Sequence, residues 1–201
     1  SPDRPVPMHR RAFLKSSLAA SLMSPGAALA ATGVEDPSRP NSRLDKLARV
    51  ITPELEMKNA NTGERIKCTF FTSTGYDMDA IEALNWFMRD WRQKEAKQID
   101  VRVLWALAAL RRAGMQDGFH GEIRFLSGYR SRKTNDLLRR RGYGAARNSL
   151  HIDARAVDFS LPGMSVTATA DYAAWLQVGG VGYYPGSFVH IDSGSIRRWT
   201  G

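Results

Sequence analysis

Apolar residues recur along the chain at two different spacings, which predict helices and short strands. Spacings of three and four residues, as on one face of a helix, predict helices at 81–91, 100–113 and 168–176. A fourth helix, short and basic, is predicted at 134–141, where Gly142 closes it. Short runs rich in apolar residues predict strands at 55–57, 66–71, 122–126, 156–159, 181–184 and 188–192.

Polar and small residues mark where several of these elements begin and end. The segment Asp77-Met78-Asp79 is typical of a helix start, and Gly114 is typical of a helix end. Turn-forming residues at 59–64 predict that the first two strands form a hairpin. Met88 and Trp91 of the helix at 81–91 are interpreted as core residues rather than as parts of a cofactor site.

The order of the elements indicates the fold class. Helices come early and short strands come late, without regular alternation, which favours an α+β fold with a small, mainly antiparallel sheet and flanking helices. The chain has 201 residues, 43% of them hydrophobic, which is enough for one packed core. We therefore predict a single domain at 51–201, preceded by a linker at 31–50 that is rich in Pro, Ser and charged residues.

Residues 1–30 have the pattern of an export signal. The paired arginines in His9-Arg10-Arg11-Ala12-Phe13-Leu14-Lys15 precede a modest apolar run that ends in Ala28-Leu29-Ala30. This pattern resembles the twin-arginine signal of bacteria. The apolar run is too short to span a bilayer permanently. We expect a signal peptide at 1–30 and a mature protein in the periplasm or cell envelope, without a stable membrane span.

Charge and cysteine content narrow the function only slightly. A net charge of +9 suits nucleic acid, anionic lipid or an acidic cell-wall polymer. Apart from Arg139-Arg140-Arg141 the basic residues are scattered, and no nucleic-acid-binding motif is present, so no nucleic-acid partner is expected. The single cysteine, Cys68, excludes an internal disulfide. Its neighbours Ile66, Phe70 and Phe71 predict a buried strand thiol rather than a metal ligand.

Three residues in the second half of the chain are candidate metal ligands. His151 and Asp158 lie seven positions apart, and His190 follows in the segment Phe-Val-His-Ile-Asp. Two imidazoles and one carboxylate are a common ligand set for a catalytic zinc ion whose fourth position is left to water. Such an ion polarises a carbonyl and acidifies the water. The alternative is that each His is an ordinary hydrogen-bonded core residue.

Three segments carry a resemblance to a known family. They are Ser127-Gly128-Tyr129-Arg130-Ser131, the segment at 149–158, and Gly-Gly-Val-Gly-Tyr-Tyr leading to Phe-Val-His-Ile-Asp at 179–192. Together they resemble the peptidase M15 superfamily of zinc D,D-peptidases, which has the hedgehog/DD-peptidase fold. Within it, residues 55–199 are most similar to the exported murein endopeptidase K group, which the twin-arginine signal also fits.

The resemblance implies roles for individual residues. His151, Asp158 and His190 match the family's zinc ligands. Arg130 matches the arginine thought to hold the substrate carbonyl or the developing oxyanion, and a fixed guanidinium beside a metal is a suitable charge clamp. The alternative for Arg130 is a loop arginine in a surface ion pair.

The chain departs from the family pattern in two places. Ala154 stands where the family usually has Gly, a change that is tolerable if the backbone φ is negative there. Ser187 and Phe188 stand where many M15 enzymes have a glutamate or a second His as the general base. The murein endopeptidase K group also lacks the glutamate, so its absence does not argue against activity.

Asp192 is one candidate for the missing role, and Asp153 is a weaker one. Asp192 shares a strand face with His190. It could orient that ligand, activate water, or cap the turn at 192–194.

The resemblance therefore implies a periplasmic zinc metallopeptidase that hydrolyses peptide cross-links of peptidoglycan. The nearest group suggests L,D (3–3) links between diaminopimelate residues, with D,D (4–3) links as a second substrate. Tyr183 and Tyr184 are candidate groove residues, although strand aromatics more often pack in the core. The alternative is a non-catalytic envelope-binding module that keeps the fold, for which the missing glutamate at 187 is the best support. Nothing in the sequence specifies an oligomeric state.

Overall fold

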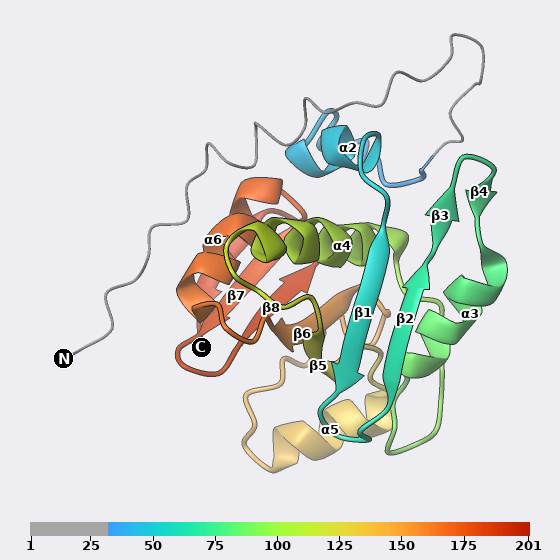
Figure 1. Cartoon of the computed structure of the whole chain (residues 1–201). Helices are drawn as coiled ribbons and strands as arrows, with labels where there is room; N and C mark the ends of the chain where they lie inside the picture. The colour runs from blue at the N-terminus through green and yellow to red at the C-terminus, as the bar shows by residue number, and fades with distance from the viewer. Residues whose placement is uncertain (1–31) are drawn as a thin grey trace, which may run out of the picture.

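A seven-stranded sheet forms the centre of the computed structural model, which describes residues 32–201 (Figure 1). The strand order is β2-β1-β5-β6-β8-β7-β9. The strands are β1 (Glu54–Asn59), β2 (Arg65–Thr69), β5 (Ile123–Ser127), β6 (Ala156–Ser160), β7 (Gly180–Tyr184), β8 (Phe188–Asp192) and β9 (Arg197–Thr200). A small separate sheet pairs β3 (Phe71–Thr72) with β4 (Gly75–Tyr76). The predicted signal peptide at 1–30 lies outside the described residues.

The sheet is mixed. Its pairs are antiparallel except for β1/β5 and β7/β9, which are parallel. Parallel neighbours need a long crossover connection, and the chain between β1 and β5 supplies one that contains two helices. The α+β class is confirmed, but the sheet is larger and less uniformly antiparallel than the sequence indicates.

Five helices accompany the sheet in the described residues: α2 (Arg43–Ala48), α3 (Met78–Phe87), α4 (Val101–Gln116), α5 (Arg132–Arg140) and α6 (Val166–Leu176). Each begins after a residue whose side-chain oxygen accepts a hydrogen bond from a first-turn backbone N–H: Ser42, Asp77, Asp100, Ser131 and Ser165. The helix start predicted at Asp77 is thus confirmed. The cap of α5 matters for the site, because Ser131 directly follows Arg130.

One face of the sheet packs against the apolar core, and the other carries the polar residues of the candidate site. Successive side chains of a strand point to opposite faces. On one face Val157 and Phe159 of β6 and Val189 and Ile191 of β8 are fully buried in the core, beneath α4 and α6 (Figure 1). The alternate positions of the same strands place the side chains of Asp158, His190 and Asp192 on the other face.

Several predicted boundaries are shifted. The helix predicted at 81–91 ends at Phe87, so Met88 is a core residue as predicted, whereas Trp91 is 37% exposed and its interpretation as core is wrong. The helix predicted at 100–113 continues through Gly114 to Gln116. A Cβ at Gly114 would lie 2.8 Å from the Met164 sulfur, so this glycine serves close packing rather than termination.

Besides the small sheet of β3 and β4, a helix and a strand were not predicted. The expected linker at 31–50 contains α2, whose Leu44 and Asp45 are buried, and the Asp45 carboxylate pairs with buried Arg102 at 2.9 Å. Strand β9 adds a seventh strand after the two that were expected to finish the chain. Both elements are short and polar, and tertiary contacts rather than their own apolar periodicity hold them.

The structure also bears on two smaller predictions, the burial of Cys68 and the absence of a stable membrane span. Cys68 is half-buried rather than buried, and burial raises the pKa of its thiol to about 11, which keeps it protonated. No helix in 32–201 has both the length and the apolar character that crossing a bilayer requires.

Candidate metal centre

The three candidate ligands predicted from the sequence lie together. Potential donor atoms of His151, Asp158 and His190 all fall within 4.8 Å of one another, and all three residues are buried. His151 Nε2 lies 3.2 Å from Asp158 Oδ2, and His190 Nδ1 lies 2.8 Å from Asp158 Oδ1. The two imidazole nitrogens are themselves 3.2 Å apart. Residues separated by up to 39 positions in the chain therefore present one set of donors to one point.

The sheet register explains part of this convergence. Strands β6 and β8 are antiparallel neighbours, and their register sets Asp158 directly opposite His190. Directly opposite residues on one face have their side chains within contact distance. His151 reaches the same point from the turn before β6, where its carbonyl accepts hydrogen bonds from the backbone N–H groups of Arg130 (3.0 Å) and Ala154 (3.2 Å).

The outer nitrogen of each imidazole is held by an acceptor. His151 Nδ1 lies 2.7 Å from the Gly128 carbonyl oxygen, which can only accept, so this nitrogen carries the proton. His190 Nε2 lies 3.0 Å from Asp192 Oδ2 and donates to that carboxylate in the same way. When both imidazoles are neutral, as metal binding requires, His151 Nε2 and His190 Nδ1 carry the lone pairs, and these face the Asp158 carboxylate. Such a group of facing acceptors needs a cation between them, so the donor set fits a divalent metal ion.

The electrostatics of the centre agree with this fit. Burial lowers the pKa of His151 below its usual value, which favours the neutral, ligating imidazole. Burial alone would raise the pKa of Asp158. The nearby His151 and the hydrogen bond to His190 outweigh burial, so the pKa of this carboxyl lies well below its usual range. Hydrogen bonds to Asp158 and Asp192 raise the pKa of His190 to about 9 against burial. The carboxylates that attract a proton there also attract a metal ion.

Asp192 is fully buried and uses both carboxylate oxygens. Oδ1 accepts from the backbone N–H groups of Gly180 (3.0 Å) and Gly194 (2.9 Å), and Oδ2 accepts from His190 and from Arg197 Nη2 (2.6 Å). This geometry supports two of the roles considered for Asp192, orienting His190 and capping the turn at 192–194. It gives no support to water activation, because no lone pair is left free for a water molecule.

Arg130 lies beside the ligands rather than on the outer surface. Its side chain is 11% exposed, and Nη2 lies 3.5 Å from Asp158 Oδ2 and 3.1 Å from Ser127 Oγ. Nη1 donates to Asn135 Oδ1 at 3.4 Å. Burial lowers the pKa of the guanidinium below its usual value and Asp158 opposes this shift, so the group stays charged. The alternative of a surface ion pair is therefore not what the structure shows.

Glycines make room for this centre. A Cβ on Gly128 would lie 2.7 Å from the Met88 carbonyl oxygen, and a Cβ on Gly180 would lie 2.5 Å from Asp192 Oδ2. Gly182 faces His190 across the β7/β8 pair, and its Cβ would lie 2.7 Å from the Trp199 ring. The glycine-rich segment at 179–182 is thus required by close approach of the Asp192–Arg197 pair and of Trp199.

Ala154 has a backbone conformation that favours glycine. Its φ is +56°, in the left-handed region, and the residue is fully buried. The condition of a negative φ, under which alanine is tolerable in place of glycine, is therefore not met. The conformation is imposed because the Ala154 N–H donates to His151 and its carbonyl accepts from the Asp100 N–H at 2.9 Å.

An open cleft of about 330 Å³ lies over the centre. Its lining includes the loop residues at 143–146 and 148–150 and the aromatic residues Tyr184, Phe188 and Trp199. Tyr184 stacks on Phe188 with ring centroids 4.2 Å apart. Tyr183 is not among the lining residues: it points to the other face, where its hydroxyl lies 3.1 Å from Thr167 Oγ1, so its predicted groove role is wrong.

The cleft contains no spare general base among the described residues. The lining carboxylates are Asp158 and Asp192, and both are engaged as described above. Asp153 is exposed and does not line the cleft, nor does Ser187. Phe188 lines it but cannot accept a proton.

Sequence reasoning missed two residues of the site. Arg197 pairs with Asp192, and the Trp199 ring lies 5.2 Å from the His190 ring. Both come from β9, whose sequence Arg-Arg-Trp-Thr has no apolar alternation typical of a strand. The signal that could have found them was the glycine pair Gly180 and Gly182, since glycines inside a strand often mark close approach of another group.

A hydrolytic metal centre requires ligands such as two imidazoles and a carboxylate that converge at a cleft. This centre, on this α+β sheet, defines the class of M15-type metallopeptidases. Comparison with family models identifies the group within that class. Residues 48–199 match the M15 peptidase family described as "Peptidoglycan L,D-endopeptidase MepK". The chain belongs to this family, and both the predicted resemblance and the prediction of a metallopeptidase are confirmed.

Curated relatives agree with the family match. The chain is 40% identical over 146 residues to the "Peptidoglycan L,D-endopeptidase MepK" of Escherichia coli strain K12, an alignment that covers 72% of this chain and 79% of the relative. It is 36% identical over 167 residues to the "Probable peptidoglycan L,D-endopeptidase MepK" of Haemophilus influenzae, covering 81% of this chain and 87% of that relative. The match to the protein of the same name in Shigella flexneri is also 40%.

Proposed function

We propose that this protein is a zinc-dependent peptidoglycan endopeptidase that hydrolyses peptide cross-links of murein. The observation that carries the proposal is the convergence of His151, Asp158 and His190 at the floor of an open cleft. Relatives that share 36–40% of the aligned residues are named as L,D-endopeptidases, which supports L,D (3–3) cross-links as the main substrate. D,D (4–3) links are the second substrate to be tested.

Zinc is the proposed metal because a set of two nitrogens and a carboxylate is typical of its catalytic sites. When bound, the ion would polarise the scissile carbonyl and lower the pKa of a water molecule. His151, Asp158 and His190 would hold it. The Gly128 carbonyl fixes the ring orientation of His151, and Asp192 fixes that of His190, since ligating imidazoles are usually oriented by such acceptors.

Arg130 is the proposed catalytic cation. Hydrogen bonds to Ser127 and Asn135 hold its guanidinium at the edge of the cleft, beside Asp158. Negative charge that develops on the carbonyl oxygen during water attack would be stabilised there without reorganisation of the side chain. Asp192 acts as a positioning residue for His190 and leaves the proton-accepting group to be sought elsewhere.

Peptidoglycan lies outside the cytoplasm, so the proposed substrate requires a periplasmic or cell-envelope location. The twin-arginine pattern at Arg10-Arg11 supports export of a folded protein.

The proposal is tested with purified mature protein on muropeptides carrying a single L,D or D,D cross-link. We expect cleavage of the L,D link, loss of cleavage on zinc chelation, and its recovery when zinc is returned. His190→Ala should lose both bound zinc and activity. His120→Ala, at an exposed residue that does not line the cleft, is the matched control and should retain both. Zinc-loaded protein that cuts neither link would instead favour the non-catalytic envelope-binding module.

A further inference from the structure

A second hollow lies beside α5, separate from the metal centre. Its volume is about 540 Å³, and it is lined by Arg132, Asp136, Arg139, Arg140 and Arg147. These five residues are called the α5 hollow below. Four of them are arginines, whereas the cleft over the metal centre contains mixed polar and aromatic side chains.

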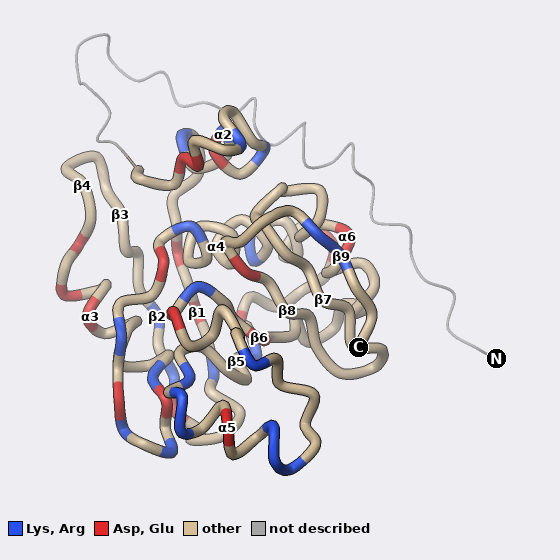
Figure 2. The backbone as a smooth tube through the Cα atoms, turned by 180° about the vertical axis from the view of Figure 1, so that it is seen from behind, with Lys and Arg blue, Asp and Glu red and all other residues tan. Residues whose placement is uncertain are grey.

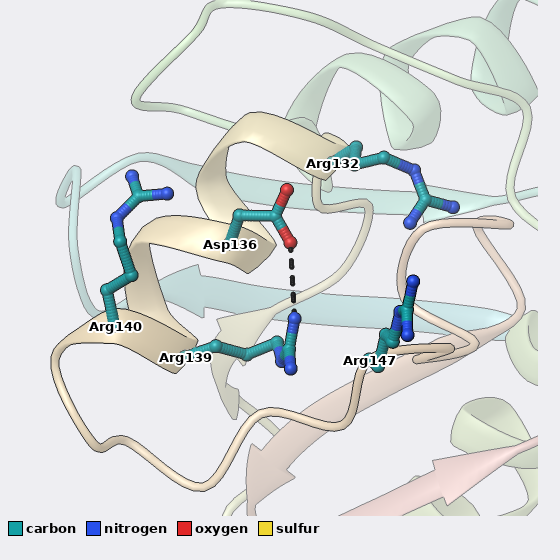
Figure 3. Close-up of a pocket in the computed structure, with 5 residues that line it drawn as sticks. All are labelled: Arg132, Asp136, Arg139, Arg140 and Arg147. Atoms are coloured by element: carbon teal, nitrogen blue, oxygen red, sulfur yellow. Dashed lines mark ion pairs between the residues drawn. The ribbon is translucent and has the colours of Figure 1, made fainter.

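The arginines approach one space from two segments. Arg132 and Arg139 extend from α5 and Arg147 from the loop that follows it, and all three point toward the space beside Asp136 (Figure 3). Arg140 lies on the other side of the helix in the same view. Asp136 pairs with Arg139 at 3.7 Å between Oδ1 and Nη1, which neutralises one charge in part.

The other charges have no counter-charge. Within residues 32–201, the side chains of Arg132, Arg140 and Arg147 form no hydrogen bond or ion pair, and all three residues are exposed. Basic residues also gather at the ends of α5 and along the following loop when the backbone is viewed from behind (Figure 2). Like charges close together on a helix destabilise it, so an unpaired group of this kind is suited to an anionic ligand.

The α5 hollow is continuous with the cleft through shared backbone. Arg147 lies between Ala146 and Asn148, which both line the cleft. Buried Asn135 on α5 joins the two places, since its Nδ2 donates to the Ala146 carbonyl at 3.0 Å and its Oδ1 accepts from Arg130. A ligand that is long enough to leave the cleft along this loop would reach the arginines next.

We infer that the α5 hollow is a subsite for free carboxylates of the peptidoglycan stem peptides that flank the cross-link being cut. This inference rests on the proposed function and deepens it. Stem peptides carry carboxylates on their acidic and diaminopimelate residues, and the planar guanidinium fork matches a carboxylate with two hydrogen bonds. Affinity for an extended, acidic peptide would then come from outside the reacting centre.

The composition of the α5 hollow disfavours other anions. Its lining has no aromatic side chain on which a nucleic-acid base could stack. It also has no apolar side chain that could enter a lipid layer. A water-soluble, multiply carboxylated chain is the ligand that its charge and its position beside the cleft fit.

The test combines an enzyme variant with a substrate variant. Arg132→Gln/Arg147→Gln removes two unpaired charges of the α5 hollow. Lys46→Gln/Arg112→Gln removes two exposed charges on α2 and α4, which line neither the cleft nor the hollow, and is the charge-matched control. Each protein is assayed on a cross-linked muropeptide with free carboxylates and on the same compound with the carboxylates that flank the link amidated.

For the free substrate we expect the KM of Arg132→Gln/Arg147→Gln to rise about tenfold, with kcat changed less than about twofold, since the lost contacts are remote from the reacting bond. The control should match the wild type. Amidation should raise the wild-type KM by a similar factor and should have almost no further effect on the arginine variant. Equal KM values for the arginine variant and the control, or an amidation effect that persists in the arginine variant, would overturn the inference while leaving the proposed function intact.

Equilibrium binding of an uncross-linked stem peptide gives a readout that needs no cleavage. The subsite is supported if Arg132→Gln/Arg147→Gln binds the peptide more weakly than the wild type and the control variant does not. Binding by the wild type should also depend more strongly on salt than binding by the arginine variant. Equal binding of the stem peptide by the arginine variant and the wild type overturns the subsite. It is also overturned if these arginines are needed for binding to anionic phospholipid vesicles but not for binding to the peptide. A wild type that cuts no muropeptide overturns the proposed function, and peptide binding then still tests the α5 hollow.

Discussion

The metal centre and the α5 hollow are both charged, but they differ in how their side chains are held. In the centre nearly every polar atom has a protein partner: Asp192 alone accepts hydrogen bonds from two backbone N–H groups, one imidazole and one guanidinium. In the α5 hollow the unpaired arginines are exposed and have no partner in 32–201. Burial accompanies pairing in the first region, and exposure accompanies free charge in the second.

This difference indicates what each region contributes. Groups that stabilise charge during a reaction are effective when they are fixed in advance, since no reorganisation is then needed at the moment of reaction. Groups that hold a long, variable substrate can remain mobile, because they add affinity rather than rate. Substitutions in the buried centre should therefore act on kcat or on metal binding, and substitutions in the α5 hollow should act on KM.

The largest effect is expected at Arg130, whose side chain is only 11% exposed and is held by hydrogen bonds to Ser127 and Asn135. Arg130→Gln should lower kcat by about 10²–10³-fold, as is typical when a donor to a developing oxyanion is removed. Bound zinc, measured by elemental analysis, should persist. Arg155→Gln is the control, because Arg155 pairs with Asp100 and Ser193 but does not line the cleft. Unchanged kcat in Arg130→Gln would remove the catalytic role and the contrast with the α5 hollow.

A smaller effect is expected at Asp192, which lines the cleft but whose oxygens are engaged by His190, Arg197 and two backbone N–H groups. Asp192→Asn should weaken zinc binding by about 10–100-fold, the usual loss when the partner of a ligating imidazole is changed. Competition with a chromophoric chelator measures this without any activity assay. Asp171→Asn is the matched control, since Asp171 also pairs with an arginine of β9, Arg198, at 2.7 Å but contacts no ligand. Equal zinc affinity in the two variants would show that Asp192 only caps its turn.

The same comparison explains which parts of the site could be predicted from the sequence. His151, Asp158 and His190 stand in segments with distinctive neighbours. Two imidazoles and one carboxylate are also a common ligand set for a catalytic zinc ion. The strands that carry Asp158 and His190 have clear apolar alternation, which fixes which side chains share a face. The three candidate ligands were therefore predictable even though the sheet order was not.

Features that depend on tertiary approach were not predictable in the same way. Trp199 and Arg197 reach the centre only because β9 pairs in parallel with β7, and no local pattern specifies that pairing. The α2 segment appears polar in sequence, yet buried Arg102 binds Asp45 and the carbonyl oxygens of Val34, Gln177 and Val178 there. Long-range contacts of this kind override local propensity.

Ala154 shows the same limit in the backbone. Nothing in its side chain requires a positive φ, and the family's usual glycine was the only hint of one. The left-handed conformation costs a non-glycine residue roughly 1–2 kcal/mol. The metal centre thus stores a small strain beside His151, whereas no residue that lines the α5 hollow has a positive φ.

The smallest expected effect follows from that strain. In Ala154→Gly, relief of the left-handed conformation offsets the lost burial of one methyl group, about 0.8 kcal/mol, and the greater freedom of glycine in the unfolded chain, about 0.5–1 kcal/mol. The free energy of unfolding, from urea denaturation, should therefore change by less than about 1 kcal/mol. Ala106→Gly is the control: this residue is equally buried but helical, so both losses act without relief and should cost about 1.3–1.8 kcal/mol. Equal destabilisation by the two substitutions would mean that Ala154 carries no strain, and that the turn holding His151 is as relaxed as the helix.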